Sequence, residues 1–281
     1  MKTTAIVLAA GRSTRMNSKK PKVLHSLLGR PMAFYALEAA RQASGAKPVA
    51  IIGHAAEMVR QALGDMAETV IQEPQLGTGH AVQQAESLLK GHSKYILVTT
   101  ADMPLLTGET LKMLVQAQQA HSGPLTLLTA TTQDARGFGR VLRDAEGHVQ
   151  GIIEGAHATP QQLAIRELNT SVYCLSAEWL WQALPRIPLS PKGEYYLTDL
   201  VGIAAADGLS IQAIEIPDPG ETIGINTRLH LAEAESLLRQ RINRGWMLAG
   251  VTMIDPQSTY IEPGVSIGQD TTLWPNTYLQ G

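Results

Sequence analysis

The sequence lacks the residues that several kinds of functional site require. Cys174 is the only cysteine among 281 residues, which excludes an internal disulfide and any zinc cluster of thiolates. The eight histidines include no pair with a metal-ligand spacing such as H-E-x-x-H. We therefore interpret the histidines as ordinary surface or partly buried residues, and we expect a protein that is kept reduced.

Long apolar runs and an excess of one charge are also missing. No run approaches the roughly 20 apolar residues of a membrane-spanning helix. The run Ala5 to Ala10 is short for a signal peptide, and Arg12 and Arg15 follow it closely. The formal net charge of −2 provides no strong positive field for nucleic acid or anionic membrane. These absences predict a cytoplasmic protein without a nucleic-acid or membrane partner, in which a few local cations hold any anionic substrate.

The composition is that of a globular protein with a substantial core, because 44% of the residues are hydrophobic and 17% are charged. A length of 281 residues favours one large domain plus a smaller unit. Within the first hundred residues, short apolar runs alternate with helical periodicity. The expected strands are Thr4–Ala10, Pro48–Gly53, Glu68–Gln72 and Tyr95–Thr100. The expected helices are Pro31–Ser44, Ala55–Leu63 and Ala81–Leu89, with Pro31 at a first helical position and Gly45 and Gly64 at helix ends.

This alternation predicts an α/β fold, with a mostly parallel sheet covered by helices on both faces. Ligands of such sheets bind at the carboxyl ends of the strands. Shorter runs follow, and we interpret them as an extension of the sheet with some antiparallel pairing: Leu125–Thr131, Gly139–Arg143, Val149–Glu154 and Leu168–Leu175.

The last part of the sequence has two further patterns. A long helix is expected over Thr227–Arg244, with an apolar stripe along one side, and Gly245 is expected to end it. Aliphatic residues then recur every six positions, at Ile261, Ile267, Leu273 and Leu279, a spacing typical of a parallel β-helix. Chance alignment of aliphatic residues is the alternative. Only about one coil precedes Gly281, so we expect a truncated chain or a fragment of a longer protein.

The loop after the first expected strand is the first candidate site. It reads L-A-A-G-R-S-T-R-M from Leu8 to Met16, followed by P-K at 21–22. Small residues let the backbone approach a phosphate closely, and Arg12, Arg15 and Lys22 add positive charge. For a lone G-x-x-x-R pattern, a glycine turn with solvated basic residues is the favoured interpretation. The G-K-[ST] of a Walker loop is missing.

The complete string resembles the L-A-A-G-x-G-T-R-M…P-K signature of sugar-phosphate nucleotidyltransferases, with Ser13 in place of the second glycine. Further strings are similar to motifs of the bacterial bifunctional N-acetylglucosamine-1-phosphate uridyltransferases and glucosamine-1-phosphate acetyltransferases. These are Q-E-P-Q-L-G-T-G-H at 72–80, G-F-G-R at 137–140, I-E at 153–154, E-L-N-T at 167–170, G-E-Y-Y-L-T-D at 193–199 and G-I-N at 224–226. The resemblance covers essentially the whole chain.

The resemblance implies a Rossmann-like nucleotidyltransferase domain over residues 1–226, a helical linker arm over 227–249 and the start of a left-handed parallel β-helix over 250–281. It implies transfer of a uridylyl group from UTP to N-acetylglucosamine 1-phosphate, which gives UDP-N-acetylglucosamine and pyrophosphate for cell-wall precursors. It also implies a homotrimer where the β-helix is complete. Acetyl transfer is expected only of a longer chain.

Residue roles follow from the same resemblance. Asp102 and Asn226 would bind Mg²⁺, and their oxygens suit that cation. Arg15 and Lys22 would be the catalytic cations that neutralise the phosphates. The substrate-binding residues would be Leu8, Ala9, Ala10, Gly11, Lys22, Gln72, Gly77, Thr78, Thr100, Ala101, Asp102, Gly139, Glu154, Asn169 and Asn226. Within this set Gln72 would face uracil, Gly77 and Thr78 the base and ribose, and Gly139, Glu154 and Asn169 the acetamido sugar.

The chain departs from the family pattern at three places. Ala101 replaces a glycine before the metal-binding aspartate, Gly155 and Ala156 follow Glu154 where a lysine is common, and Ser171 replaces a glycine after N-T. These departures concern sugar specificity more than the chemistry. Three alternatives stay open: a nucleotidyltransferase for another sugar or nucleotide, a non-catalytic nucleotide-sugar-binding module, and an acetyltransferase built on the hexapeptide region.

Overall fold

A mixed β-sheet forms the centre of the computed structural model, which describes residues 2–12, 14–132, 135 and 137–281. Ser13 of the basic loop lies outside the described residues. The strand order is β11-β7-β10-β6-β1-β4-β5, and β8 and β9 extend the sheet beside β10. The strands are β1 (Thr3–Ala9), β4 (Val49–Ile52), β5 (Glu68–Ile71), β6 (Tyr95–Thr100), β7 (Leu125–Thr131), β8 (Gly139–Arg143), β9 (Val149–Ile153), β10 (Glu167–Ser176) and β11 (Ile211–Glu215).

Strand direction divides the sheet as the sequence predicted. β1 pairs in parallel with β4 and β6, β4 pairs with β5, and β7 pairs with β11. β10 is antiparallel to β6, β7 and β8, and β8 is antiparallel to β9. The mostly parallel sheet and the antiparallel extension are therefore both confirmed.

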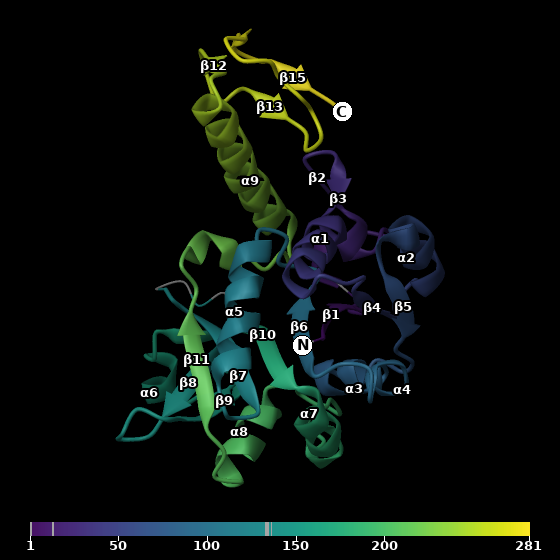
Figure 1. Ribbon diagram of the computed structural model, residues 1–281, viewed down its shortest axis with the longest axis vertical. Coiled ribbons are helices and arrows are strands. Elements are labelled where there is room, and N and C mark those ends of the chain that lie inside the picture. Colours follow the sequence, from purple (N-terminus) through teal and green to yellow (C-terminus); the bar gives the residue numbers. More distant parts are fainter. Residues whose placement is uncertain (1, 13, 133–134, 136) are drawn as a thin grey trace.

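Helices cover both faces of this sheet (Figure 1). The α-helices are α1 (Met32–Ser44), α2 (Ala56–Leu63), α3 (Thr78–Gln83), α4 (Glu86–Leu89), α5 (Gly108–Ala120), α6 (Pro160–Leu163), α7 (Ala177–Ala183), α8 (Asp199–Ala206) and α9 (Arg228–Leu248). The 3₁₀ turns are η1 (Thr14–Met16), η2 (Lys22–Leu24), η3 (Gly64–Met66), η4 (Gly155–His157), η5 (Leu184–Arg186) and η6 (Pro219–Thr222).

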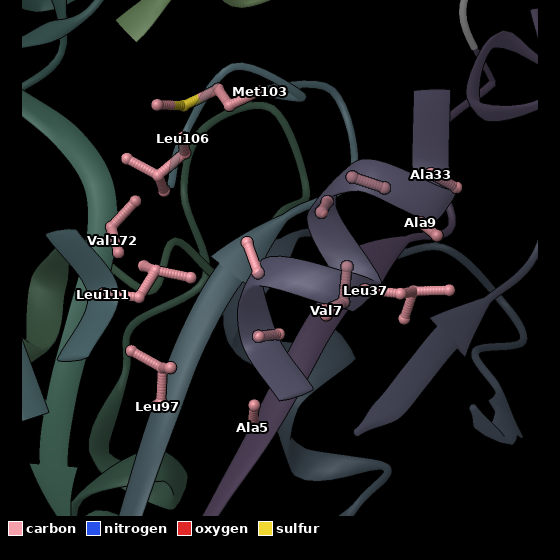
Figure 2. Packing of buried hydrophobic residues seen from close by; sticks show 14 of the residues in the cluster. Ala5, Val7, Ala9, Ala33, Leu37, Leu97, Met103, Leu106, Leu111 and Val172 are labelled. Carbon is pink, nitrogen blue, oxygen red and sulfur yellow. The ribbon is translucent and has the colours of Figure 1, made fainter. Parts of the chain in front are cut away.

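The alternation of side chains along each strand gives the two faces separate cores. Ala5, Val7 and Ala9 of β1 pack with α1 and α5, and Figure 2 shows them together with Leu37 of α1 and Leu111 of α5. Ile6, between them, faces the other core, which contains α3, α4, α7 and α8. Burial on both faces explains why these strands are continuous apolar runs.

Three boundaries differ from the sequence-based expectation. The expected helix Ala81–Leu89 is two short helices, α3 and α4, although Ala81, Ala85 and Leu89 all face the sheet as the periodicity indicated. Pro31 is the N-cap of α1, not its first residue. Helices α5, α6, α7 and α8, strand β11 and the short strands at 26–27 and 30–31 were not predicted.

The third difference concerns α9, which was expected to end at Gly245 but continues to Leu248. Ile242 and Trp246 pack against the last strands of the chain. We infer that this packing outweighs the low helix propensity of glycine, about 1 kcal/mol. The helix ends one turn later, where Gly250 has a φ of +95°.

Helix α9 leads from the sheet to a small group of strands at one end of the molecule (Figure 1). These strands are β12 (Thr252–Met253), β13 (Tyr260–Ile261), β14 (Thr272–Leu273) and β15 (Tyr278–Leu279), and they pair in parallel as β12 with β14 and β13 with β15. Ile261, Ile267, Leu273 and Leu279, the four positions of the six-residue spacing, all lie in one apolar cluster.

A short hairpin of the larger domain, β2 (Ser26–Leu27) and β3 (Arg30–Pro31), lies beside these strands (Figure 1). Arg30 donates from Nη2 to the main-chain oxygen of Pro263 at 3.0 Å. The terminal strands are thus held by α9 and by the larger domain. Within the described part of the chain, none of the helices is both long and apolar enough to cross a membrane.

Candidate active site

A cavity of about 640 Å³ opens at the carboxyl ends of β1, β5 and β6. Ten of the sequence-predicted substrate residues line it: Leu8, Ala9, Ala10, Gly11, Lys22, Gln72, Gly77, Thr78, Thr100 and Asp102. Arg12, expected to add positive charge beside a phosphate, lines it as well. Six further lining residues had no role assigned to them: Val23, Pro74, Gln75, Ala81, Glu194 and Tyr196. The cavity lies where parallel sheets bind their ligands.

Two cations and two oxygen-bearing side chains meet at one edge of this cavity. Lys22 donates from Nζ to Asp102 Oδ2 at 2.6 Å and to Asn226 Oδ1 at 3.0 Å. Arg15 donates from Nη2 to the same Asn226 oxygen at 3.1 Å. We call Arg15, Lys22, Asp102 and Asn226 the phosphate-side cluster. Its members come from segments more than 200 residues apart in the sequence.

The electrostatics of the cluster favour an ionised Asp102. The side chain of Lys22 is 12% exposed and that of Asp102 is 26% exposed. Burial alone would raise the pKa of the Asp102 carboxyl, but the charge of Lys22 and its hydrogen bond outweigh burial and hold that pKa below its usual value. An ionised carboxylate is therefore available as a ligand or a counter-charge across the neutral pH range.

The backbone fixes the positions of Asp102 and Asn226. Ala101 donates its main-chain N–H to the oxygen of Leu8 at 3.0 Å, which joins the residue after β6 to the end of strand β1. Ile225 donates to the main-chain oxygen of Asp102 at 2.8 Å, which places Asn226 beside the aspartate. Ala101 is not among the described residues with a positive φ, so alanine fits where the family usually has glycine.

The donor set of the cluster fits a divalent cation. Asp102 and Asn226 offer one carboxylate and one amide oxygen, and both oxygens already converge on a single ammonium group, Lys22 Nζ. Hard cations such as Mg²⁺ prefer oxygen ligands of these kinds. The described residues therefore could hold such an ion between the end of β6 and the start of α9.

The segment from Gln72 to Thr78 forms another part of the cavity lining. Gln72 is 3% exposed and donates from Nε2 to the Gly77 oxygen at 2.8 Å. Gly77 has a φ of +94°, and a Cβ there would come within 2.6 Å of the Tyr195 oxygen. Gly79 donates to Tyr195 O and Tyr195 donates to Leu76 O, each at 2.8 Å. Only glycine at 77 permits this close approach of the two segments.

The three predicted sugar residues form a second group beside the cavity. Asn169 of β10 pairs with Gly139 of β8, and a Cβ on Gly139 would lie 3.6 Å from Glu154 Oε1. Thr198 donates its hydroxyl to the same Glu154 oxygen at 3.3 Å. We call Gly139, Glu154 and Asn169 the sugar-side cluster. None of the three lines the cavity itself, whereas Tyr196, close to Thr198, does.

Buried polar groups surround the sugar-side cluster. Asn169 donates from Nδ2 to the Tyr173 hydroxyl at 2.7 Å. Burial raises the pKa of the Glu154 carboxyl, and the negative charge of Asp199 adds to this increase. Burial also raises the pKa of Asp199. Glu154 of the cluster and the neighbouring Asp199 are therefore costly to ionise as they stand, and hydrogen bonds from ligand hydroxyls would stabilise their ionised forms.

Ser171, one of the departures from the family pattern, has a φ of +61°. It lies where the register of β10 against β7 shifts between Asn169 and Tyr173. Ser171 N donates to Asn169 Oδ1 at 3.2 Å. The backbone at residue 171 therefore adopts the conformation that glycine favours, although the chain has serine there.

Comparison with known proteins gives one family and many close relatives. The model of the MobA-like NTP transferase domain matches residues 5–164. The bifunctional protein GlmU of Heliobacterium modesticaldum is 44% identical over 281 residues, which are 100% of this chain and 61% of the relative. The protein of the same name from Trichlorobacter lovleyi is 45% identical over 280 residues, 99% of this chain and 61% of the relative. The chain thus spans about three fifths of the length of these curated relatives.

Solved structures share the fold at low sequence identity. The structure of CMP:2-keto-3-deoxy-manno-octonic acid synthetase complexed with CTP has a TM-score of 0.62 and 17% identity, and covers 86% of this chain and 100% of that chain. A putative glucose-1-phosphate thymidylyltransferase from Bacillus anthracis has a TM-score of 0.67 and 18% identity, and covers 84% of this chain and 94% of that chain. The Rossmann-like nucleotidyltransferase fold expected from the sequence is thereby confirmed.

Proposed function

The chain belongs to the family of MobA-like NTP transferase domains, and from this premise we propose that it transfers a uridylyl group from UTP to N-acetylglucosamine 1-phosphate. The products are UDP-N-acetylglucosamine, a cell-wall precursor, and pyrophosphate. Whole-chain identities of about 44% to proteins named bifunctional protein GlmU support the proposal. The motifs that resemble those of the uridyltransferases lie within the aligned residues.

One observation carries the proposal. Lys22 and Asp102 of the phosphate-side cluster line the same cavity as Gln72, Gly77 and Thr78, and the loop from Leu8 to Gly11 lines it as well. A nucleoside triphosphate needs this combination: a polar group for the base, small residues beside the phosphates, and cations where negative charge is greatest.

The reaction requires no protein nucleophile. An ionised oxygen of the sugar 1-phosphate attacks the α-phosphorus of UTP, a new O–P bond forms, and the bond to the β-phosphate breaks with release of pyrophosphate. Catalysis of this kind depends on positioning and charge stabilisation. Arg15 and Lys22 neutralise charge on the α-phosphate and the leaving group.

We assign the metal site to Asp102 and Asn226, and the metal to Mg²⁺. Both oxygens lie within hydrogen-bond distance of Lys22 Nζ, so they can share one cation. When bound, Mg²⁺ would supply charge neutralisation for the phosphates of both substrates. Asp102 enters this role already ionised, because Lys22 lowers its pKa despite burial.

We assign recognition of the nucleotide base and recognition of the sugar to two separate groups of residues. Gln72, with Gly77 and Thr78, would hold the uracil and ribose. Glu154 would accept hydrogen bonds from sugar hydroxyls, while Gly139 and Asn169 shape the wall behind them. Thr100 and Ala101 would complete the floor beside Asp102.

We also propose the domain limits 1–226, 227–249 and 250–281, with the last segment beginning a left-handed parallel β-helix after a helical arm. The parallel pair Ile261 and Leu279, 18 residues apart, supports a coil of three six-residue units. A homotrimer formed through a complete β-helix and a cytoplasmic location belong to this proposal.

A panel of nucleotides and sugar phosphates tests the proposal against its nearest rival, the same chemistry on other substrates. UTP with N-acetylglucosamine 1-phosphate should give the highest kcat/KM among UTP, CTP, dTTP and ATP, each paired with N-acetylglucosamine, glucosamine and glucose 1-phosphates. A higher value for another pair would favour the rival. Nucleotide binding without turnover of any pair would favour a non-catalytic module.

A further inference from the structure

Gln72 has both of its amide hydrogens within reach of protein acceptors. Its Nε2 lies 2.8 Å from the Gly77 oxygen and 3.1 Å from His80 Nδ1. The Gly77 oxygen can only accept, so the NH₂ of Gln72 faces it, and turning the amide around would lose this bond. If His80 Nδ1 accepts the second hydrogen, Oε1 is the only polar atom of Gln72 left for a ligand.

The second nitrogen of the His80 ring creates a conflict. Gln84 Nε2 lies 3.0 Å from His80 Nε2 and 3.1 Å from the His80 main-chain oxygen. In this arrangement the NH₂ groups of Gln72 and Gln84 would both donate to the imidazole ring of His80. A neutral ring accepts at one nitrogen and carries hydrogen on the other, and a protonated ring accepts at neither. One of the two amides must therefore turn its oxygen toward the ring.

Gln84 is the amide that can turn. Gln72 is 3% exposed and fixed by Gly77, whereas Gln84 is only half-buried. The His80 oxygen keeps a main-chain partner if the Gln84 side chain turns, because Gln84 N donates to it at 3.3 Å. With Gln84 Oε1 facing the ring, His80 carries its hydrogen on Nε2 and accepts on Nδ1. Both ring nitrogens are then satisfied, and the Gln84 side chain gives up its bond to the His80 oxygen.

We propose that His80 is a positioning residue that sets base selectivity by holding Gln72 with its oxygen toward the nucleotide. His80 does not line the cavity, so it acts through Gln72. This inference rests on the proposed function in that Gln72 is taken to face the base. In the described residues no donor bonds Gln72 Oε1, and the amide lines the cavity.

The proposed orientation predicts which bases are favoured. An outward oxygen accepts a hydrogen bond from an imide N–H such as N3–H of uracil, but it repels the unprotonated N3 of cytosine. An amide held by the Gly77 oxygen alone would turn more easily, and it would adapt better to either base by presenting its oxygen or its NH₂. Loss of the His80 acceptor should therefore relax discrimination more than it weakens binding of UTP.

The tautomer can be tested without any enzyme assay. In ¹⁵N spectra of histidine-labelled protein, the His80 ring, assigned by its loss in a His80→Asn variant, should carry its hydrogen on Nε2 and accept on Nδ1. A ring with hydrogen on Nδ1 would place a donor against the Gln72 NH₂ and would overturn the inference.

Two substitutions at position 80 test the consequence. His80→Leu removes the acceptor and should lower the UTP-over-CTP preference roughly 2- to 12-fold, the value of one net hydrogen bond. His80→Asn can place an amide oxygen near the former Nδ1 and should restore most of the preference. Calorimetric dissociation constants for UTP and CTP give the preference directly, and thermal unfolding checks that both variants fold.

The outcomes separate this inference from the proposed function. An unchanged preference in folded His80→Leu, no better preference in His80→Asn than in His80→Leu, or equal affinities in the wild type would each overturn it. Absence of UDP-N-acetylglucosamine formation in the wild type would instead contradict the proposed function. The tautomer and the two affinities would still be measurable in that case.

Discussion

The two clusters beside the cavity differ in how their charges are compensated. On the phosphate side, Asp102 is paired with Lys22 at 2.6 Å, and its pKa is lowered despite burial. On the sugar side, Glu154 has a hydroxyl partner, and burial with the nearby Asp199 raises its pKa. Asp102 is therefore ionised at neutral pH, whereas ionising Glu154 is costly unless a ligand supplies hydrogen bonds to it. Substitutions on the two sides should therefore fail in different ways.

The largest effect is expected on the phosphate side. Asp102→Ala and Asn226→Ala should each lower turnover by about 100-fold or more, the usual effect of removing a preorganised electrostatic group. Circular dichroism should show an intact fold. Glu146→Ala, which changes an exposed carboxylate on a distant turn, is the matched control and should keep full activity. Near-normal turnover in folded Asp102→Ala would remove the metal assignment.

Gln72 tests the base end of the same cavity. Gln72→Ala should lower the ratio of kcat/KM for UTP over CTP roughly 5- to 150-fold, because losing a buried hydrogen-bond partner costs about 1–3 kcal/mol. Gln75→Ala, another cavity residue from the same loop, should change the ratio less. If the ratio is unaffected at position 72, the base is recognised elsewhere.

Glu154 tests the sugar side through pH. Its folded pKa is raised, so its contribution to stability is full below the ordinary glutamate pKa and is lost as pH rises through the folded pKa. Glu154→Gln removes this loss and should unfold at a higher temperature than the wild type at pH 8. The two proteins should converge near pH 4.

Activity should move in the opposite direction in the same variant. Glu154→Gln should raise the KM for the sugar phosphate while the KM for UTP stays nearly constant, because Glu154 lies outside the nucleotide cavity. If the difference in unfolding temperature between Glu154→Gln and the wild type does not change with pH, ionisation of Glu154 does not destabilise the folded protein.

The smallest effect concerns Ser171. A left-handed conformation costs a non-glycine residue about 1–2 kcal/mol in the folded state. Glycine avoids this cost, but it lowers the free energy of unfolding by about 0.4–1 kcal/mol because it gives the unfolded chain more conformational entropy. Ser171→Gly should therefore stabilise the protein slightly, by up to about 1 kcal/mol. Ser171→Ala keeps the φ of +61° and serves as the control. Denaturant unfolding in which glycine is less stable than alanine would contradict the interpretation.

The phosphate side could be predicted further from the sequence than the sugar side. Arg15, Lys22 and Asp102 lie on segments after strands that were recognisable as continuous apolar runs. Asn226 follows no such strand, and its place beside them came from the family resemblance alone. The sugar side depends on the antiparallel pairing of β8 with β10 and on a bulge at Ser171, and neither has a local signal. The role of His80 could be inferred only from the side-chain contacts of Gln72, because the sequence motif does not show which way the Gln72 amide is oriented.

Helix boundaries show the same limit. The apolar stripe of α9 identified the helix, but Gly245 was taken as its end because glycine is a poor helix former. Packing of Trp246 against the terminal strands carries the helix one turn further. Long-range contacts of this kind outweigh local propensity, and only the folded chain shows them.

The central claim is that the two sides hold two substrates for one group transfer, and ³¹P NMR of the reaction tests it most directly. With UTP, N-acetylglucosamine 1-phosphate and Mg²⁺, the account predicts pyrophosphate and UDP-N-acetylglucosamine in equal amounts, with neither formed when the sugar phosphate is omitted. Inorganic phosphate as the product, or pyrophosphate release without the sugar phosphate, would contradict it.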